Sequence, residues 1–190
     1  ELPSYLGGLQ AFNAFGADME GIKSDEFGMC PVALEKKMAE LSSLGKKPKF
    51  IYVIPDFQNP SGITMPESRR KEIIDIAHKY EVLIVEDSPY RELRFDGEPQ
   101  KTIYQLDEMG TTITLGTFSK IFVPGFRIGW IIAHPAIVDK FVTTKQSVDL
   151  CTPAFVQRIA ARYMEKGYFE KNLKSTIRLY GKKKEVMMQS

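Results

Sequence analysis

Three short runs of apolar and β-branched residues constrain the fold of this chain more than any other feature of the sequence. They occupy residues 50–54, 82–85 and 111–115, and a proline, an acidic pair or a glycine ends each one. A half-exposed strand alternates apolar and polar residues, whereas a strand buried on both faces is apolar throughout, as in a parallel sheet. We therefore predict three buried strands of one sheet.

Helical patterns fill the intervals between these runs. One helix is expected over residues 31–44, with Pro31 in its first turn and Gly45 just past its end. A second is expected from Thr64 to Tyr80, opened by a Thr-x-x-Glu capping box. The residues expected on the inward faces of these two helices are Leu34, Met38, Leu41, Leu44, Ile73, Ile74 and Ala77.

From about residue 135 the pattern becomes entirely helical. Helices are predicted over residues 135–145, 153–166 and from 169 onward, the last with an apolar stripe of Phe169, Leu173, Ile177 and Tyr180. Alternating strands and helices predict an α/β fold, with three α/β/α layers, a mainly parallel sheet and a helical C-terminal part.

Charge and composition exclude several function classes. The 26 Lys and Arg against 24 Asp and Glu give a net charge of +2, which offers no global attraction for nucleic acid or an anionic membrane. No apolar run approaches the ~20 residues of a membrane span. Cys30 and Cys151 lie far apart without metal-ligand spacing, so we expect no metal site and no disulfide, as in a reducing cytoplasm.

Polar residues of unusual chemistry follow the three runs. Asn59, Asp87, Tyr90 and Lys120 come after strand ends, where ligands bind in open α/β sheets, so we expect them to converge on one crevice. Taken singly, each has a structural alternative: a turn former for Asn59, a turn cap for Asp87, packing for Tyr90 and a solvated surface position for Lys120.

A phosphate monoester is the anion that best fits the third strand end. Residues 116–120 lack the spacing of a Walker loop, but the hydroxyls of Thr117 and Ser119 with the guanidinium of Arg127 could hold one phosphate. Arg127 is alone in an apolar run, and a buried arginine requires an anion. Phosphate, lysine and aspartate together suggest pyridoxal 5′-phosphate.

The same residues form three motifs that resemble a known family. The motifs are Asn59-Pro60-Ser61-Gly62, Asp87-Ser88-Pro89-Tyr90, and Ser119-Lys120 followed by residues 124–130. Their order and spacing resemble the fold-type I, class I/II aminotransferases, in the branch of the aromatic, 2-aminoadipate and kynurenine enzymes. The same domain occurs in MocR-type transcription regulators.

The resemblance implies a role for each matching residue. Lys120 would be the catalytic residue, forming the Schiff base with the cofactor and then moving the proton at the substrate Cα. Asp87 would pair with the pyridine nitrogen, and Asn59 and Tyr90 with the phenolic oxygen. Thr117, Ser119 and Arg127 would bind the phosphate. The Asn59–Pro60 peptide is expected to be cis.

The resemblance also sets expectations for the whole protein. It implies transfer of an amino group from an amino acid to a 2-oxo acid, by a cytoplasmic homodimer that contacts neither membrane nor nucleic acid through this segment. The chain looks like a fragment: residues 1–150 as part of the cofactor-binding large domain, and residues 151–190 as helices leading toward a small domain. Alone it should be inactive. The alternatives are an effector-sensing domain of a MocR/GntR-type regulator and a fold-type I lyase or synthase.

Overall fold

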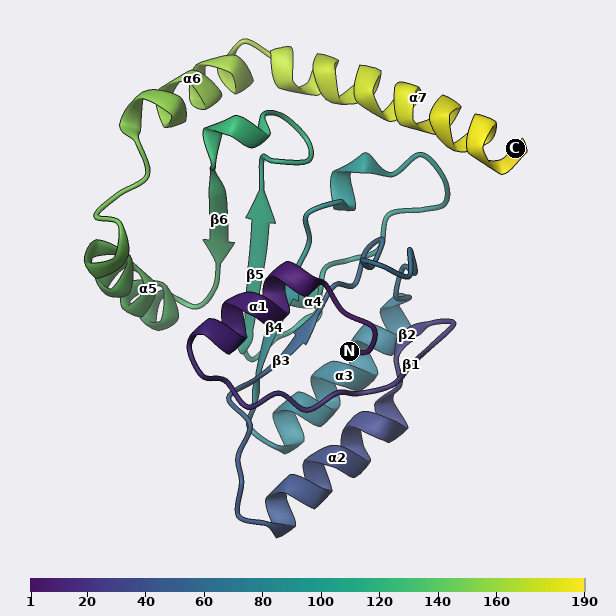
Figure 1. Ribbon diagram of the computed structural model, residues 1–190, viewed down its shortest axis with the longest axis vertical. Coiled ribbons are helices and arrows are strands. Elements are labelled where there is room, and N and C mark those ends of the chain that lie inside the picture. The colour runs from purple at the N-terminus through teal and green to yellow at the C-terminus, as the bar shows by residue number, and fades with distance from the viewer. Residues whose placement is uncertain (190) are drawn as a thin grey trace. The chain divides into compact units, whose positions relative to one another are not determined.

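The computed structural model describes residues 1–189, which form two compact units (Figure 1). The first unit comprises Glu1–Ser88 and Gln100–Thr114, and the second comprises Pro89–Pro99 and the chain from Leu115 onward. Helices and a mainly parallel sheet together confirm the predicted α/β class.

The sheet of the first unit is built from the predicted apolar runs. Strands β3 (Phe50–Val53) and β4 (Leu83–Asp87) pair in parallel, with Tyr52 opposite Val85. The first residues of β5 (Thr112–Thr117) lie next to β4. Strands β4 and β5 extend beyond their apolar runs at the carboxyl ends, so β4 includes the acidic residues that follow its run, whereas β3 ends one residue before its run does. A separate antiparallel pair joins β1 (Ser24–Asp25) to β2 (Gly28–Met29).

Two amphipathic helices share the core of this unit. Helices α2 (Pro31–Ser43) and α3 (Glu67–Lys79) pack against each other (Figure 1), and their apolar faces join β3 and β4 in one buried cluster. Six of the seven predicted inward residues are buried, but Leu44 is 63% exposed because α2 ends before it. The remaining helices of this unit are α1 (Leu6–Ala14) and α4 (Ile103–Leu106).

The predicted capping box at Thr64 is wrong. Helix α3 begins at Glu67 with Pro66 as its N-cap, and the Thr64 hydroxyl instead accepts a hydrogen bond from Phe57 N at 3.3 Å. Glu67 is also engaged elsewhere, because its carboxylate accepts from Lys101 N at 3.0 Å. Both side chains are thus used by segments that local spacing cannot reveal.

The second unit combines a two-stranded ladder with three long helices. The end of β5 pairs with β6 (Gly129–Ile132), which runs in the opposite direction (Figure 1), and the short helix η2 (Pro124–Phe126) lies between them. Helix α7 packs against α6 and against the short helix η1. The bounds are η1 (Arg91–Leu93), α5 (Pro135–Val148), α6 (Ala154–Glu165) and α7 (Tyr168–Gln189).

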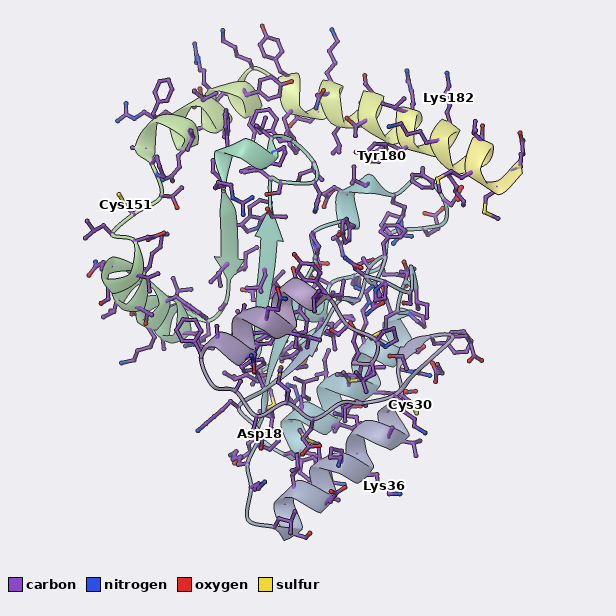
Figure 2. All side chains as sticks on the ribbon, in the orientation of Figure 1. Asp18, Cys30, Lys36, Cys151, Tyr180 and Lys182 are labelled. Carbon is purple, nitrogen blue, oxygen red and sulfur yellow. The ribbon has the colours of Figure 1, made fainter. Side chains whose placement is uncertain are left out.

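Both cysteines carry free thiols (Figure 2). Cys30 is the N-cap of α2, and Cys151 is exposed in the segment between α5 and α6. Within residues 1–189, no helix combines the length and apolarity needed to cross a membrane.

Candidate functional site

Asp87 ends β4, and a tyrosine of the neighbouring strand holds its carboxylate. The hydroxyl of Tyr52 donates to Asp87 Oδ2 at 2.7 Å, and both side chains are half-buried. Burial raises the pKa of the Asp87 carboxyl above its ordinary value, while this hydrogen bond partly offsets the rise. Sequence reasoning found Asp87 but missed Tyr52, because an isolated tyrosine in an apolar run gives no signal of a polar partner.

Asn59 lies in a tightly hydrogen-bonded turn after β3. The Asn59–Pro60 peptide is cis, as predicted. Gln58 N donates to Ile63 O at 2.9 Å, and Gly62, at a φ of 74° that favours glycine, donates its N–H back to Gln58 O at 2.6 Å. The Asn59 side chain is half-buried in this turn.

A fully buried arginine ties this turn to α3. Arg70 Nη2 lies 3.1 Å from Asp56 Oδ1, and neither side chain is exposed to solvent. The same guanidinium donates to the carbonyl oxygens of Met65 at 2.9 Å, Lys101 at 3.0 Å and Pro55 at 3.1 Å. Sequence analysis did not identify this network, because Arg70 sits in a charged stretch of α3 that is typical of a solvated helix face.

Glu86, the neighbour of Asp87, is a second buried charged residue that was not predicted. Its carboxylate accepts from Ile103 N at 3.0 Å, Tyr104 N at 3.2 Å and the Thr114 hydroxyl at 2.9 Å. Burial raises the pKa of Glu86, although these hydrogen bonds and the charge of Arg70 act in the opposite direction. The side chain therefore anchors the end of β4 to the start of α4.

In the second unit, Lys120 lies beside Tyr90. The lysine Nζ is 5.9 Å from the centre of the Tyr90 ring, within the range of a cation–π contact. Lys120 itself is exposed, and Tyr90 is half-buried just before η1. The amine is thus held near a phenol while remaining open to solvent.

Thr117, the last residue of β5, forms a cluster with Ser119 and Arg127 of the loop between β5 and β6. Ser119 N donates to Thr117 Oγ1 at 3.0 Å, and Arg127 Nη1 donates to Ser119 Oγ at 3.5 Å. A hydroxyl that accepts from a guanidinium can still donate its own hydrogen to an anion. Thr117 Oγ1 donates its own hydrogen to Ile128 O at 3.3 Å, so the Ser119 hydroxyl and the Arg127 guanidinium are the donors of this cluster that suit a phosphate group in this geometry.

The environment of Arg127 differs from the prediction. The residue is exposed and lies in the turn before β6, rather than buried within a strand. Its φ of 52° is in the left-handed region, which is uncommon for a residue other than glycine, and Nη1 also donates to Pro124 O at 3.2 Å. The apolar run around Arg127 favoured a buried position because it could not show the chain reversal at η2.

Each unit therefore gathers part of the predicted residue set. The first unit carries Asn59 and Asp87, and the second carries the remainder, namely Tyr90, Thr117, Ser119, Lys120 and Arg127. An amine, a hydroxyl–guanidinium cluster suited to an anion and a half-buried carboxylate are the kinds of groups that pyridoxal 5′-phosphate chemistry requires.

Comparison with known proteins places this chemistry in a family. Residues 2–189 match the family described as "Aminotransferase class I and II". The chain is 49% identical, over its whole length, to an aromatic-amino-acid aminotransferase 1 of Thermococcus litoralis, covering 46% of that protein. It is 34% identical to the uncharacterized HTH-type transcriptional regulator YisV of Bacillus subtilis, with 91% of this chain and 35% of that protein covered.

Solved structures agree with the sequence matches. The crystal structure of the Pyrococcus horikoshii kynurenine aminotransferase, in complex with PMP, superimposes with a TM-score of 0.95 at 47% identity. The match covers 98% of this chain and 46% of that one. The chain spans about half the length of the curated relatives it matches, in agreement with the expectation that it corresponds to part of such a protein. By this sequence and structural evidence, the chain belongs to the class I and II aminotransferase family.

Proposed function

We propose that the protein to which this chain belongs is a pyridoxal 5′-phosphate-dependent aminotransferase, which moves an amino group from an amino acid to a 2-oxo acid. The observation that carries the proposal lies in the second unit. Lys120 directly follows Ser119 in the sequence, and the Ser119 hydroxyl accepts a hydrogen bond from Arg127 Nη1 at 3.5 Å. An amine next to a phosphate-binding cluster is the minimal attachment point for this cofactor.

The residues of this chain would divide the work by their chemistry. Arg127, Ser119 and Thr117 would hold the phosphate, and Lys120 Nζ would attach the cofactor and then carry a proton to and from the substrate Cα. When bound, the cofactor supplies an electron sink for the electrons released at Cα.

The first unit would act on the cofactor ring. Asp87 would hold a proton on the ring nitrogen, since a carboxylate favours the charged form of a basic partner. Asn59 would orient the phenolic oxygen by hydrogen bonding, together with Tyr90 of the second unit. The relative crystallised with PMP supports this choice of cofactor.

Reductive labelling tests the proposal directly. The full-length protein, loaded with pyridoxal 5′-phosphate and reduced with borohydride, should carry the cofactor on Lys120 after peptide mapping. Lys145→Ala is the matched control, because this lysine is paired with Asp149 on α5 and should leave labelling unchanged. A label on a different lysine, or none in the wild type, would refute the assignment.

The half-reaction with an amino acid separates transamination from the alternatives. A transaminase converts the amino acid to its 2-oxo acid and leaves the cofactor in its amine form, whereas a lyase or synthase does not. Lys120→Ala should slow this step by about 10²- to 10⁴-fold, the usual contribution of a general acid–base. The chain also resembles a transcriptional regulator. If the full-length protein binds the cofactor and DNA but converts no amino acid, the regulator alternative is supported and the aminotransferase proposal is wrong.

The finer expectations from the family belong to the same proposal. We infer a cytoplasmic homodimer whose small-molecule substrates are an amino acid and a 2-oxo acid, with residues 1–150 belonging to the large domain and residues 151–190 leading toward a small domain. Sedimentation of the full-length protein would report the dimer.

A further inference from the structure

Tyr52 of the first unit contacts a proposed site residue, Asp87, but has no role of its own in the proposed function. It lies on β3 opposite Val85, so its side chain shares a sheet face with Asp87, two residues further along β4. Such diagonal neighbours are within reach of a long aromatic side chain. The observed 2.7 Å hydrogen bond from Tyr52 Oη to Asp87 Oδ2 follows from this register.

Helix α1 holds the Tyr52 ring from the other side. The Phe12 ring contacts Tyr52 edge-on, with centroids 5.2 Å apart at an angle of 76°. A Cβ atom built on Gly8 would lie 3.0 Å from Tyr52 Oη, so the backbone of α1 passes close to the hydroxyl. The phenol is thereby confined between α1 and the end of β4.

The hydroxyl is a permanent donor in this environment. Burial, followed by the charge of Asp87 and the hydrogen bond to it, raises the pKa of the Tyr52 phenol; Glu1 and Tyr5 act in the same direction. A phenol that donates to a carboxylate at 2.7 Å stabilises the ionised form of that carboxylate. The contact therefore favours the anionic state of Asp87 against the effect of burial.

We propose that Tyr52 is a positioning residue for the cofactor site: by donating to Oδ2 of Asp87, it fixes this carboxylate and leaves Oδ1 as the oxygen that meets the pyridine nitrogen. This proposal rests on the proposed function, since it assigns Tyr52 a role through Asp87. A merely structural tyrosine would stabilise the fold without changing the ionisation of Asp87 or the protonation of the cofactor.

The first arm of the test uses the cofactor-free full-length protein. With ¹³C-labelled aspartate, NMR titration should show a higher pKa for Asp87 in Tyr52→Phe than in the wild type. Tyr104→Phe is the matched control, because it removes a hydroxyl from the same unit on α4 and should leave Asp87 unchanged. An unchanged Asp87 pKa in Tyr52→Phe would overturn the role of Tyr52, whether or not the protein binds a cofactor.

A second variant guards against a folding defect. Gly8→Ala keeps the tyrosine but adds a methyl group 3.0 Å from its hydroxyl, in a helix that tolerates alanine better than glycine. Displacing the phenol should shift the Asp87 pKa in the same direction as Tyr52→Phe, and by less. A shift in the opposite direction would contradict the assigned contact.

The second arm uses the holoenzyme. With ¹⁵N-labelled cofactor, the ring nitrogen of Tyr52→Phe should lose its proton at lower pH than in the wild type. We expect kcat to fall about tenfold with KM little changed, as for one lost hydrogen bond to a charged group. If the wild type binds no cofactor, the proposed function fails while the first arm still decides the Tyr52–Asp87 contact. If the ring nitrogen titrates identically in both proteins, the positioning role is wrong.

Discussion

Replacing Arg70 by methionine removes the charged end of a fully buried side chain and keeps most of its length. The guanidinium donates to the carbonyl oxygens of Met65, Lys101 and Pro55, and it faces the buried Asp56 carboxylate at 3.1 Å. Methionine can fill the space but offers no donor to any of these acceptors. The variant therefore separates the packing contribution of Arg70 from its polar contribution.

The expected loss is large because a buried carboxylate loses its cation. Removing one partner of a buried ion pair lowers the free energy of unfolding by about 3–5 kcal/mol, whereas replacing both partners by well-packed apolar residues is often neutral. Replacing Asp56 as well, in an Arg70→Met/Asp56→Leu double variant, removes both charges. The double variant should be more stable than Arg70→Met, which would give a coupling free energy typical of residues in direct contact.

The neighbouring arginine provides a matched control. Arg69 lies next in the sequence of α3 and pairs with Asp25 at 2.9 Å, but their side chains are 14% and 33% exposed. Arg69 also donates to Met29 O at 2.9 Å. Because Asp25 is partly exposed and water can solvate it when the guanidinium is lost, Arg69→Met should cost less than Arg70→Met, about 1–2 kcal/mol. Urea unfolding and native-state hydrogen exchange of the full-length proteins would measure both variants. In Arg70→Met, the backbone amides at the start of α3 should exchange their hydrogens with solvent about 10²- to 10³-fold faster than in the wild type.

Equal losses in the two arginine variants would refute this prediction, since the expected difference in stability arises from burial and not from the residue type. A double variant less stable than Arg70→Met would also refute it, because the destabilisation could then not arise from the charge left on Asp56.

Two further predictions concern other parts of the chain. Gly116→Ala places a Cβ 2.2 Å from the Trp130 indole and should cost about 1–3 kcal/mol and change the tryptophan emission; Gly125→Ala, with no atom within 4 Å, should do neither. Burial acts to raise the pKa of Asp107, but hydrogen bonds, chiefly from Thr112 and Thr111, outweigh it, so the pKa in the folded protein lies below the ordinary value of 3.8. The contribution of ionised Asp107 to the stability of the fold is therefore complete above pH 3.8 and is lost as the pH falls through the lowered pKa. The stability difference between the wild type and Asp107→Asn, about 1–3 kcal/mol near neutral pH, should therefore shrink in acid; a difference that grows in acid would contradict this sign.

The strands were predictable because their signal is local. Runs of apolar and β-branched residues located β3, β4 and β5 to within a few residues, because such residues favour strands that are buried on both faces. The strand ends were less accurate, because backbone hydrogen bonding continues through Glu86 and Asp87 regardless of side-chain polarity. Helix periodicity likewise identified the buried faces of α2 and α3.

The candidate site was predictable only in part. Asn59, Asp87 and Lys120 follow strand ends, where polar residues in an α/β fold indicate ligand chemistry. Tyr52 and Arg70 could not be found in this way, because their partners are 35 and 14 residues away in the sequence. A capping box illustrates the same limit: the Thr-x-x-Glu pattern at Thr64 forms none, whereas Thr102 forms one with Gln105.

These buried contacts explain why the first unit can hold its polar loops in fixed positions. The turn that carries Asn59 is attached to α3 through Arg70, and the end of β4 that carries Asp87 is attached to α4 through Glu86. Arg70 Nη1 and Glu86 Oε1 are 4.0 Å apart, so both attachments meet in one buried charge cluster. A change in this cluster should therefore alter the turn after β3 and the end of β4 together, whereas the loss of the Tyr52 hydroxyl should affect Asp87 alone.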